Sequence, residues 1–137
     1  MAHRLNEQAE TLLVVDDDEA IRQLEVRVLS QLGYKVLEAE GPVEALQVAA
    51  VTPIIHLLLT DYSMPQVNGL ELAQRFRTVH PTTPVLMVSG SLEEIVGRAG
   101  LPDRFAVLAK PFRLEDLVDT VRALLSPATC HHATAAT

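Results

Sequence analysis

The chain has 137 residues, 48% hydrophobic and 21% charged, which suits one domain with a buried core and argues against a disordered chain. Its formal net charge of −7 disfavours nonspecific binding to nucleic acid or anionic lipid. The single cysteine, Cys130, excludes an intrachain disulfide and indicates a reducing compartment. No apolar run reaches the roughly 18 residues of a membrane span, and the first residues lack the apolar core of a signal peptide. We therefore expect a cytoplasmic protein without membrane insertion.

Short apolar segments that favour strands alternate with segments whose apolar residues recur at helical spacing. The strands are predicted at residues 12–15, 34–38, 54–61, 85–88 and 105–109, and the helices at 18–32, 42–51, 70–79, from about 91, and at 114–125. Gly33 is expected to end the first helix, and Gly69 to lie in a turn. The apolar residues on the helix faces are expected in the core, among them Leu24, Leu32, Val43, Val79 and Leu114.

This strand–helix alternation, repeated five times with short connections, predicts an α/β fold with a parallel sheet and helices on both faces. The globular domain is expected at residues 11–125, with a flexible lead-in at 1–10 and a flexible tail or linker at 126–137. Cys130-His131-His132 in that tail offers too few ligands to predict a metal site. Arg22 and Arg27 of the first helix are expected on its solvated face.

Polar residues follow four of the predicted strands: Asp16 and Asp17, then Asp61, Ser89 and Lys110. Each alone suits a turn or a helix cap. The carboxyl ends of parallel strands meet at one edge of a sheet, where open α/β folds bind ligands. The recurrence of polar residues at this position therefore predicts a site.

The chemistry of these side chains is consistent with phosphoryl transfer. Carboxylates at one sheet edge repel one another, and a divalent cation such as Mg²⁺ relieves that repulsion through oxygen ligands. A carboxylate can also attack a phosphoryl group to form an aspartyl phosphate. Lys110 would neutralise charge on that group, and Ser89 would donate a hydrogen bond to one of its oxygens.

Four motifs occur in order along the chain: Val14-Val15-Asp16-Asp17, Leu59-Thr60-Asp61-Tyr62-Ser63-Met64-Pro65 with Gly69, Val88-Ser89-Gly90, and Lys110-Pro111-Phe112. Together they resemble the receiver domain of two-component response regulators, over about residues 11–125. The resemblance implies a flavodoxin-like (βα)5 three-layer sandwich with sheet order 2-1-3-4-5. The segment around Lys110 is also similar to receivers appended to hybrid histidine kinases, so the chain is either free-standing or part of such a kinase.

By this resemblance Asp61 is the phosphoacceptor, and the donor is a phosphohistidine on a histidine kinase or a histidine phosphotransfer domain. The resemblance further implies that Asp17 binds Mg²⁺ (or Mn²⁺) directly, together with Asp61. Asp16 would act mainly through a metal-bound water, and Ser63 through its backbone carbonyl.

The resemblance assigns Ser89 as the switch hydroxyl that moves toward the phosphoryl group, and Lys110 as the ion-pair partner of that phosphoryl group. Phosphorylation is expected to change the surface near residues 70–79, 90–100 and 107–112, and so to control a downstream protein or output domain. The chain is thus expected to be a signalling domain rather than an enzyme, with at most self-catalysed phosphorylation and dephosphorylation. Direct nucleic-acid binding is not expected, and homodimer formation is left open.

Three residues depart from the pattern of the family. His56 stands where many receivers have an acid, and a structural role is expected for it. Gly90 follows the switch serine where alanine is commoner, which loosens the loop. Val107 occupies the position of the usual switch aromatic, and Phe105 lies two residues too early on the same strand face. The conformational readout is therefore expected to differ from the aromatic switch.

Two other functions are consistent with part of the pattern. Asp16-Asp17-Asp18 also resembles the nucleophile and acid pair of haloacid-dehalogenase-type phosphatases, with Ser89 and Lys110 as later motifs. That hypothesis leaves Asp61 without a role. The second alternative is a receiver-like scaffold that takes no phosphate, against which the full set of acids, serine and lysine argues.

Overall fold

The computed structural model describes residues 9–90 and 103–126. They form strands β1 (Thr11–Val15), β2 (Lys35–Ala39), β3 (Leu57–Asp61), β4 (Val85–Ser89) and β5 (Phe105–Ala109), and helices α2 (Glu19–Gln31), α3 (Pro42–Val51), α4 (Gly69–Phe76) and α6 (Leu114–Leu125). The helix expected from about residue 91, and the terminal segments up to residue 8 and from residue 127 with Cys130, lie outside the described residues. None of the described helices is long and apolar enough to cross a membrane.

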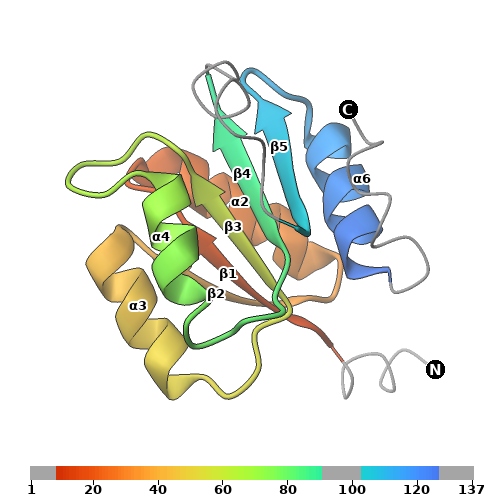
Figure 1. The fold of residues 1–137 in the computed structure, drawn as a ribbon. Coiled ribbons are helices and arrows are strands. Elements are labelled where there is room, and N and C mark those ends of the chain that lie inside the picture. Colours follow the sequence, from red (N-terminus) through yellow and green to blue (C-terminus); the bar gives the residue numbers. More distant parts are fainter. Residues whose placement is uncertain (1–8, 91–102, 127–137) are drawn as a thin grey trace.

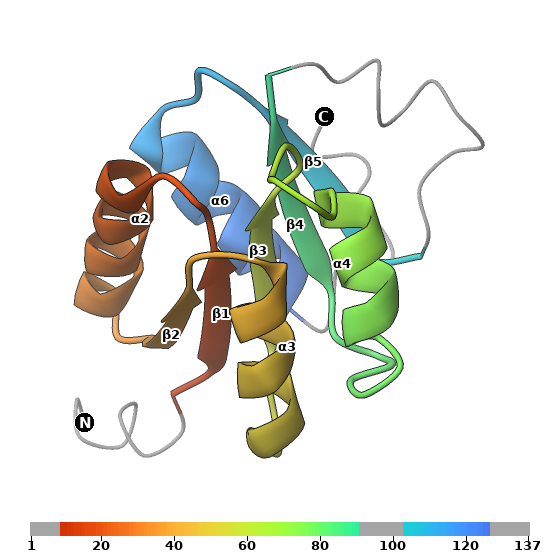
Figure 2. The same cartoon turned by 90° about the vertical axis from the view of Figure 1, so that its left-hand side faces the viewer.

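The strands form one sheet in the order β2-β1-β3-β4-β5, with every neighbouring pair parallel. Their arrowheads therefore point to the same edge of the sheet (Figure 1). Helices α3 and α4 cover one face, and α2 and α6 cover the other (Figure 2). The predicted flavodoxin-like three-layer fold and its strand order are confirmed.

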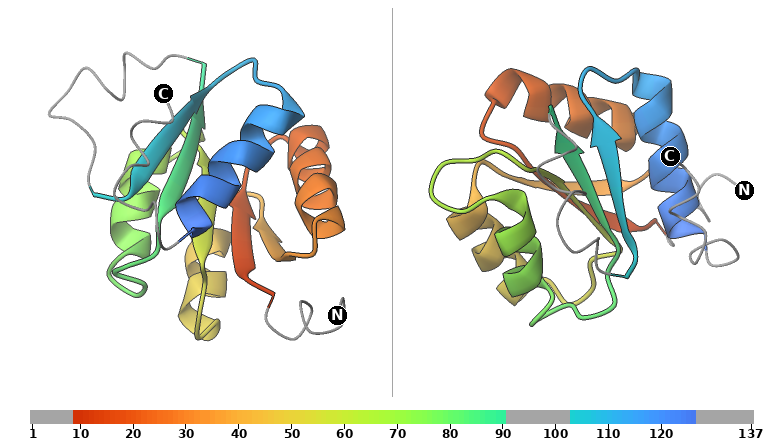
Figure 3. Two further views of the ribbon diagram at one scale, coloured as in Figure 1. Left: turned by 90° about the vertical axis from the view of Figure 1, so that its right-hand side faces the viewer. Right: turned by 45° about the horizontal axis from the view of Figure 1, so that its top comes forward.

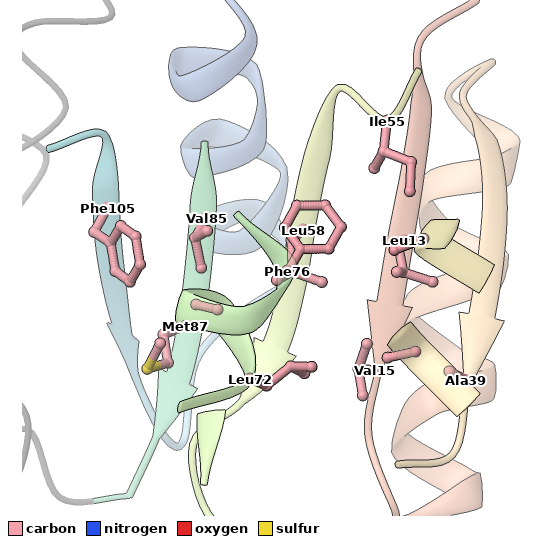
Figure 4. Close-up of a cluster of buried hydrophobic side chains, with 13 residues drawn as sticks. Leu13, Val15, Ala39, Ile55, Leu58, Leu72, Phe76, Val85, Met87 and Phe105 are labelled. Atoms are coloured by element: carbon pink, nitrogen blue, oxygen red, sulfur yellow. The ribbon is translucent and has the colours of Figure 1, made fainter. Parts of the chain in front are cut away.

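Both faces of the sheet are apolar because successive side chains of each buried strand point to opposite sides. Leu58 of β3 packs with Phe76 of α4 on the first face (Figure 4). Its neighbour Leu59 packs with Leu117 of α6 on the second. All four of these side chains are at most 1% exposed, so the central strand is fixed from both sides.

The boundaries of α2 and α3 follow the predicted signals. Asp18 caps α2, and its side chain accepts the backbone N–H of Ile21 at 3.2 Å. Gly33 follows the helix with a φ of 102°, which glycine adopts without steric cost, and donates its N–H to the carbonyl of Ser30 at 3.0 Å. Pro42 occupies the first turn of α3, where its missing N–H costs no helical hydrogen bond.

The side of α2 that faces the sheet differs from the predicted side. Leu24 and Leu32 are 45% and 39% exposed, whereas Glu25 and Leu29 are 3% and 0% exposed. Residues four or eight positions apart lie on one side of a helix. Leu24 and Leu32 share one such side of α2, and Glu25 and Leu29 share the adjacent side. Packing against the sheet selects the stripe with Glu25, so the placement of Leu24 and Leu32 in the core is wrong.

Three further apolar residues are exposed, against the prediction: Val43 by 62%, Val79 by 50% and Leu114 by 40%. Val79 lies beyond α4, which ends at Phe76, three residues earlier than the predicted end. Val43 and Leu114 belong to the first turns of α3 and α6. Helical spacing predicts which residues share a stripe but not which turns reach the sheet.

The apolar segment before Asp61 becomes a strand only from Leu57. Ile54 is 63% exposed, so the predicted strand start at residue 54 is wrong, although Ile55 is buried. His56 is exposed, and its Nδ1 accepts the backbone N–H of Thr11 at 2.9 Å. This hydrogen bond joins the start of β3 to β1 and agrees with the structural role expected for His56.

Candidate functional site

Three carboxylates gather where β1 and β3 end. Asp16 follows β1 directly and Asp61 is the last residue of β3. With Asp17 they place one carboxylate oxygen each within 4.8 Å of the others, an arrangement that could hold a metal ion. Asp16 and Asp61 are 2% and 6% exposed, and Asp17 is exposed to solvent. The predicted convergence of acids from two strand ends is thus present in the structure.

The environment of Asp16 makes this cluster electrostatically unfavourable without a cation. Burial raises the pKa of Asp16, and the charges of Asp61 and Asp17 raise it further, against the hydrogen bond that Asp16 accepts from the Asp18 N–H at 2.9 Å. Carboxylate oxygens close together are the ligands that Mg²⁺ accepts. The donor set therefore fits a hard divalent cation.

Lys110 faces the acids from the end of β5. Its Nζ lies 2.9 Å from Asp61 Oδ1, and its backbone N–H donates to the carbonyl of Ser89 at 2.8 Å. The contact with Asp61 is an ion pair without well-directed hydrogen-bond geometry. Burial lowers the pKa of Lys110, but the ion pair with Asp61 outweighs burial and leaves that pKa raised. The ammonium is therefore charged at neutral pH.

The two serines predicted to belong to the site, Ser89 and Ser63, lie at the same edge of the sheet. Ser89 is the last residue of β4 and is 4% exposed. Its neighbour Val88 is the register partner of Asp61, so the Ser89 position lies beside the phosphoacceptor candidate. Ser63 is exposed in the connection that follows Asp61.

Two residues without a predicted role in phosphoryl transfer contact the backbone around the site. Gly69 is the first residue of α4 rather than part of a turn, which corrects the prediction, and its N–H donates to the Tyr62 carbonyl at 2.7 Å. Arg22 is also not on a solvated face: its side chain is 12% exposed, pairs with Glu38 at 2.9 Å and donates to the Asp16 carbonyl at 2.8 Å. The guanidinium thus ties α2 to the end of β1.

The prediction overlooked one more ionisable residue near the site. Glu25 is 3% exposed on the inner side of α2. Burial raises its pKa to about 8, with a further increase from the negative charge of Asp16 and a decrease from Lys110. A charged residue four positions before buried Leu29 was the available sequence signal.

Strand β5 carries no aromatic residue at position 107. Val107 is partly buried on the same side of the sheet as Phe105, as expected from their spacing. Phe105 is 2% exposed, and the guanidinium of Arg77 lies 4.6 Å from its ring centroid. Phe105 is therefore held in the core.

Comparison with known proteins defines the class. The family model for the response regulator receiver domain matches residues 12–122 of this chain. The chain is 36% identical over 117 residues to the sensor kinase CckA of Brucella abortus, covering 84% of this chain and 12% of CckA. It is 31% identical over 115 residues to the response regulator receiver protein CpdR of the same organism, covering 83% of this chain and 95% of CpdR.

Solved structures agree with these matches. The receiver domain of the hybrid histidine kinase CckA has a TM-score of 0.71 at 32% identity, covering 85% of this chain and 99% of that one. The chemotaxis response regulator CheY4 of Vibrio cholerae has a TM-score of 0.70 at 32% identity, with the same coverage. The fold is that of a two-component receiver domain, and the chain belongs to the response regulator receiver domain family.

Proposed function

We propose that Asp61 accepts a phosphoryl group from a phosphohistidine on a histidine kinase or a histidine phosphotransfer domain. The observation that carries this proposal is the position of the Asp61 carboxylate, which has oxygens of Asp16 and Asp17 within 4.8 Å and the ammonium of Lys110 at 2.9 Å. The family membership supports it, and so does the similarity to a kinase and to a receiver-only regulator.

In the proposed reaction, a carboxylate oxygen of Asp61 attacks the phosphorus atom. The N–P bond of the phosphohistidine breaks, its electron pair returns to the imidazole, and an acyl phosphate forms on Asp61. Lys110 neutralises charge on the transferred group, and Ser89 donates a hydrogen bond to one of its oxygens. Ser89 ends the strand that pairs with β3, and Lys110 follows β5, one strand further on, with its Nζ 2.9 Å from Asp61 Oδ1. These positions support the two roles.

A divalent cation, Mg²⁺ or Mn²⁺, would be held by Asp16, Asp17 and Asp61, with the backbone carbonyl of Ser63. When bound, it neutralises the phosphoryl oxygens and the mutual repulsion of the acids. Burial, together with the smaller effect of the Asp61 and Asp17 charges, raises the pKa of Asp16, and a bound cation would stabilise this carboxyl in its ionised form, which supports the assignment.

The phosphorylated domain would act on a downstream protein or output domain. The chain spans 12% of the length of CckA and about half that of the response regulator MprA of Mycobacterium ulcerans, with which it shares 38% identity. We propose residues 11–125 as the functional unit, with lead-in and tail outside it. Val107 lacks the ring of an aromatic switch, so signalling would use the Ser89 and Lys110 loops instead.

The test is phosphorylation by labelled acetyl phosphate with Mg²⁺. We expect acid-labile phosphate on the native chain, and none on D61N or after chelation of the metal. D119N, which alters an exposed carboxylate on α6, serves as the matched control and should be labelled normally. Full labelling of D61N would relocate the acceptor. Turnover of a generic phosphomonoester would favour the phosphatase alternative, and no labelling with no response to beryllofluoride would favour a scaffold.

A further inference from the structure

A hollow lies at the edge of the sheet where the strands begin, opposite the acidic cluster. Its volume is about 250 Å³, and the residues that line it precede β1, β3, β4 and β5 or lie at the end of α6, among them Glu10, Ile55, His56, Thr82, Arg104 and Leu124. Figure 3 shows the end of α6 near the start of β5. This space, the amino-edge hollow, lies away from the proposed phosphoryl chemistry, which takes place at the other edge.

The starts of the strands fix the shape of the amino-edge hollow. The backbone N–H of His56 donates to the Thr11 carbonyl at 2.7 Å, and that of Val85 donates to the Arg104 carbonyl at 3.0 Å. Neighbouring strands lie about 4.8 Å apart, and the strand order places β3 and β4 between β1 and β5, so the backbones at Glu10 and Arg104 stand roughly 14 Å apart across the strands. These two residues therefore lie at opposite ends of the hollow.

The Arg104 end of the hollow carries donors for an anion. Arg104 is partly buried, and its Nε has no hydrogen-bond partner within the described residues, which costs free energy. The Nδ1 atom of exposed His56 accepts the Thr11 N–H at 2.9 Å, so the neutral ring carries its hydrogen on Nε2, which is a donor. The hydroxyl of exposed Thr82 is a further donor. A carboxylate at this end would stabilise the guanidinium charge and accept from the other two groups.

The Glu10 end carries the opposite charge, and the lining also has an apolar part. Glu10 is partly buried, and the ion pairs of the described residues include neither Glu10 nor Arg104. Ile55 and Leu124, which are 3% and 2% exposed, line the same hollow. A ligand with a single charge would leave one of the two charged side chains without a partner. The hollow therefore fits a molecule with two opposite charges and an apolar body.

We propose that the amino-edge hollow binds a small aliphatic molecule with a carboxylate at one end and an ammonium at the other, of the ω-amino acid class. The carboxylate pairs with the Arg104 guanidinium and accepts from His56 Nε2, and the ammonium pairs with Glu10. The methylene chain between the charges lies against Ile55 and Leu124 and is removed from water. The distance across the strands favours charges that are several carbons apart over those of an α-amino acid. This site does not depend on the proposed function.

The experiment titrates the ¹⁵N-labelled native chain with 6-aminohexanoate and follows the backbone amide shifts. We expect shifts at His56, Thr83 and Arg104 that saturate with a Kd of roughly 1 mM, which suits a ligand of about nine non-hydrogen atoms. Hexanoate lacks the ammonium, hexylamine lacks the carboxylate, and leucine carries both charges at one end. Each of these should bind at least about fivefold more weakly, because one charged contact is lost.

Two variants assign the charged contacts. E10Q should weaken the binding of 6-aminohexanoate about fivefold and leave that of hexanoate unchanged, whereas R104M should weaken the binding of both. E71Q and R75M change exposed charges of α4 and are the matched controls, so they should alter neither affinity. Urea unfolding checks that E10Q and R104M remain folded, and the ligand series on the native chain needs no variant.

Several results would overturn the proposal. One is the absence of saturable shifts when the native chain is titrated with 6-aminohexanoate. Shifts confined to the Asp61 edge would show that the carboxylate binds at Lys110 instead. Equal affinities for hexanoate and 6-aminohexanoate, or native affinities in E10Q, would contradict the contact with Glu10. Leucine that binds as tightly as 6-aminohexanoate would contradict a ligand with its charges at two ends.

Discussion

Gly69 allows α4 to pack directly against the backbone at Asp61. Helix α4 begins at Gly69, directly against the backbone that leaves β3, and a Cβ there would lie 2.5 Å from the Asp61 carbonyl oxygen and 2.9 Å from the Tyr62 Cα. Both neighbours are backbone atoms, so neither can turn away. The close approach of α4 to the site therefore requires glycine at this position.

We expect G69A to lower the free energy of unfolding by about 1–3 kcal/mol, because the clash with backbone outweighs the gain of roughly 1 kcal/mol from alanine in a helix. Urea unfolding measures the change. Gly90 is exposed with open space around its Cα, so G90A is the control and should change stability by no more than about 0.5 kcal/mol. A G69A variant as stable as the native chain would contradict the close approach.

At the scale of elements, one side chain joins α4 to the β4 and β5 edge. The guanidinium of Arg77, just past α4, donates to the carbonyls of Thr83 at 2.9 Å and Asp103 at 2.8 Å, and covers the ring of Phe105 at 4.6 Å. Planar guanidinium groups satisfy several carbonyls at fixed angles, which a lysine cannot reproduce. Arg77 therefore fixes the start of β5, and with it the strand that carries Lys110.

Replacing Arg77 tests this link. R77M keeps the apolar stem but leaves the carbonyls without donors, and we expect a loss of about 2–4 kcal/mol in the free energy of unfolding. R75M changes an exposed arginine in the last turn of α4 and should cost at most about 0.5 kcal/mol. Amide hydrogen exchange should quicken in β5 for R77M alone. Equal losses of unfolding free energy in R77M and R75M would show that the guanidinium contacts of Arg77 contribute little to stability.

The sequence predicts strands better than helix faces for a physical reason. A buried strand is apolar on both sides, so its apolar length marks it, and β5 was predicted with both of its ends correct. A helix is buried on one side only. The side of α2 with Leu24 and the side with Leu29 both carry apolar residues at helical spacing, and only packing against the sheet determines that Leu29 is buried and Leu24 is not. The strand ends then bring Asp16, Asp61 and Lys110 together without further information.

Other features of the site depend on contacts that no local pattern encodes. The need for glycine at position 69 arises from the approach of α4 to the strand exit at Asp61. The burial of Arg22 depends on Glu38 and the Asp16 carbonyl, which lie on other elements. Long-range approach of this kind becomes visible only in the folded chain.

At the scale of the whole molecule, two carboxyl groups retain protons more strongly when the chain is folded. Burial raises the pKa of both Asp16 and Glu25, and the mutual repulsion of the acids adds to it. A chain with a net charge of −7 therefore holds two of its acids in places that disfavour further negative charge. The stability of the fold should depend on pH accordingly.

The pKa of Glu25 is raised from 4.5 to about 8, so between these values the folded state binds more protons than the unfolded state. The contribution of Glu25 to the free energy of unfolding is then largest near pH 4.5, falls as pH rises, and levels off above pH 8, with a slope of up to about 1.4 kcal/mol per pH unit. Urea unfolding from about pH 5 to pH 9 checks this for the native chain and E25Q, which has no proton to lose there. The free energy of unfolding of the native chain minus that of E25Q should decrease by a few kcal/mol from about pH 5 to pH 9. The same quantity for the native chain and E19Q, which makes the same charge change at an exposed position of α2, should not change with pH. A flat difference for E25Q as well would mean that Glu25 reaches water in the folded protein.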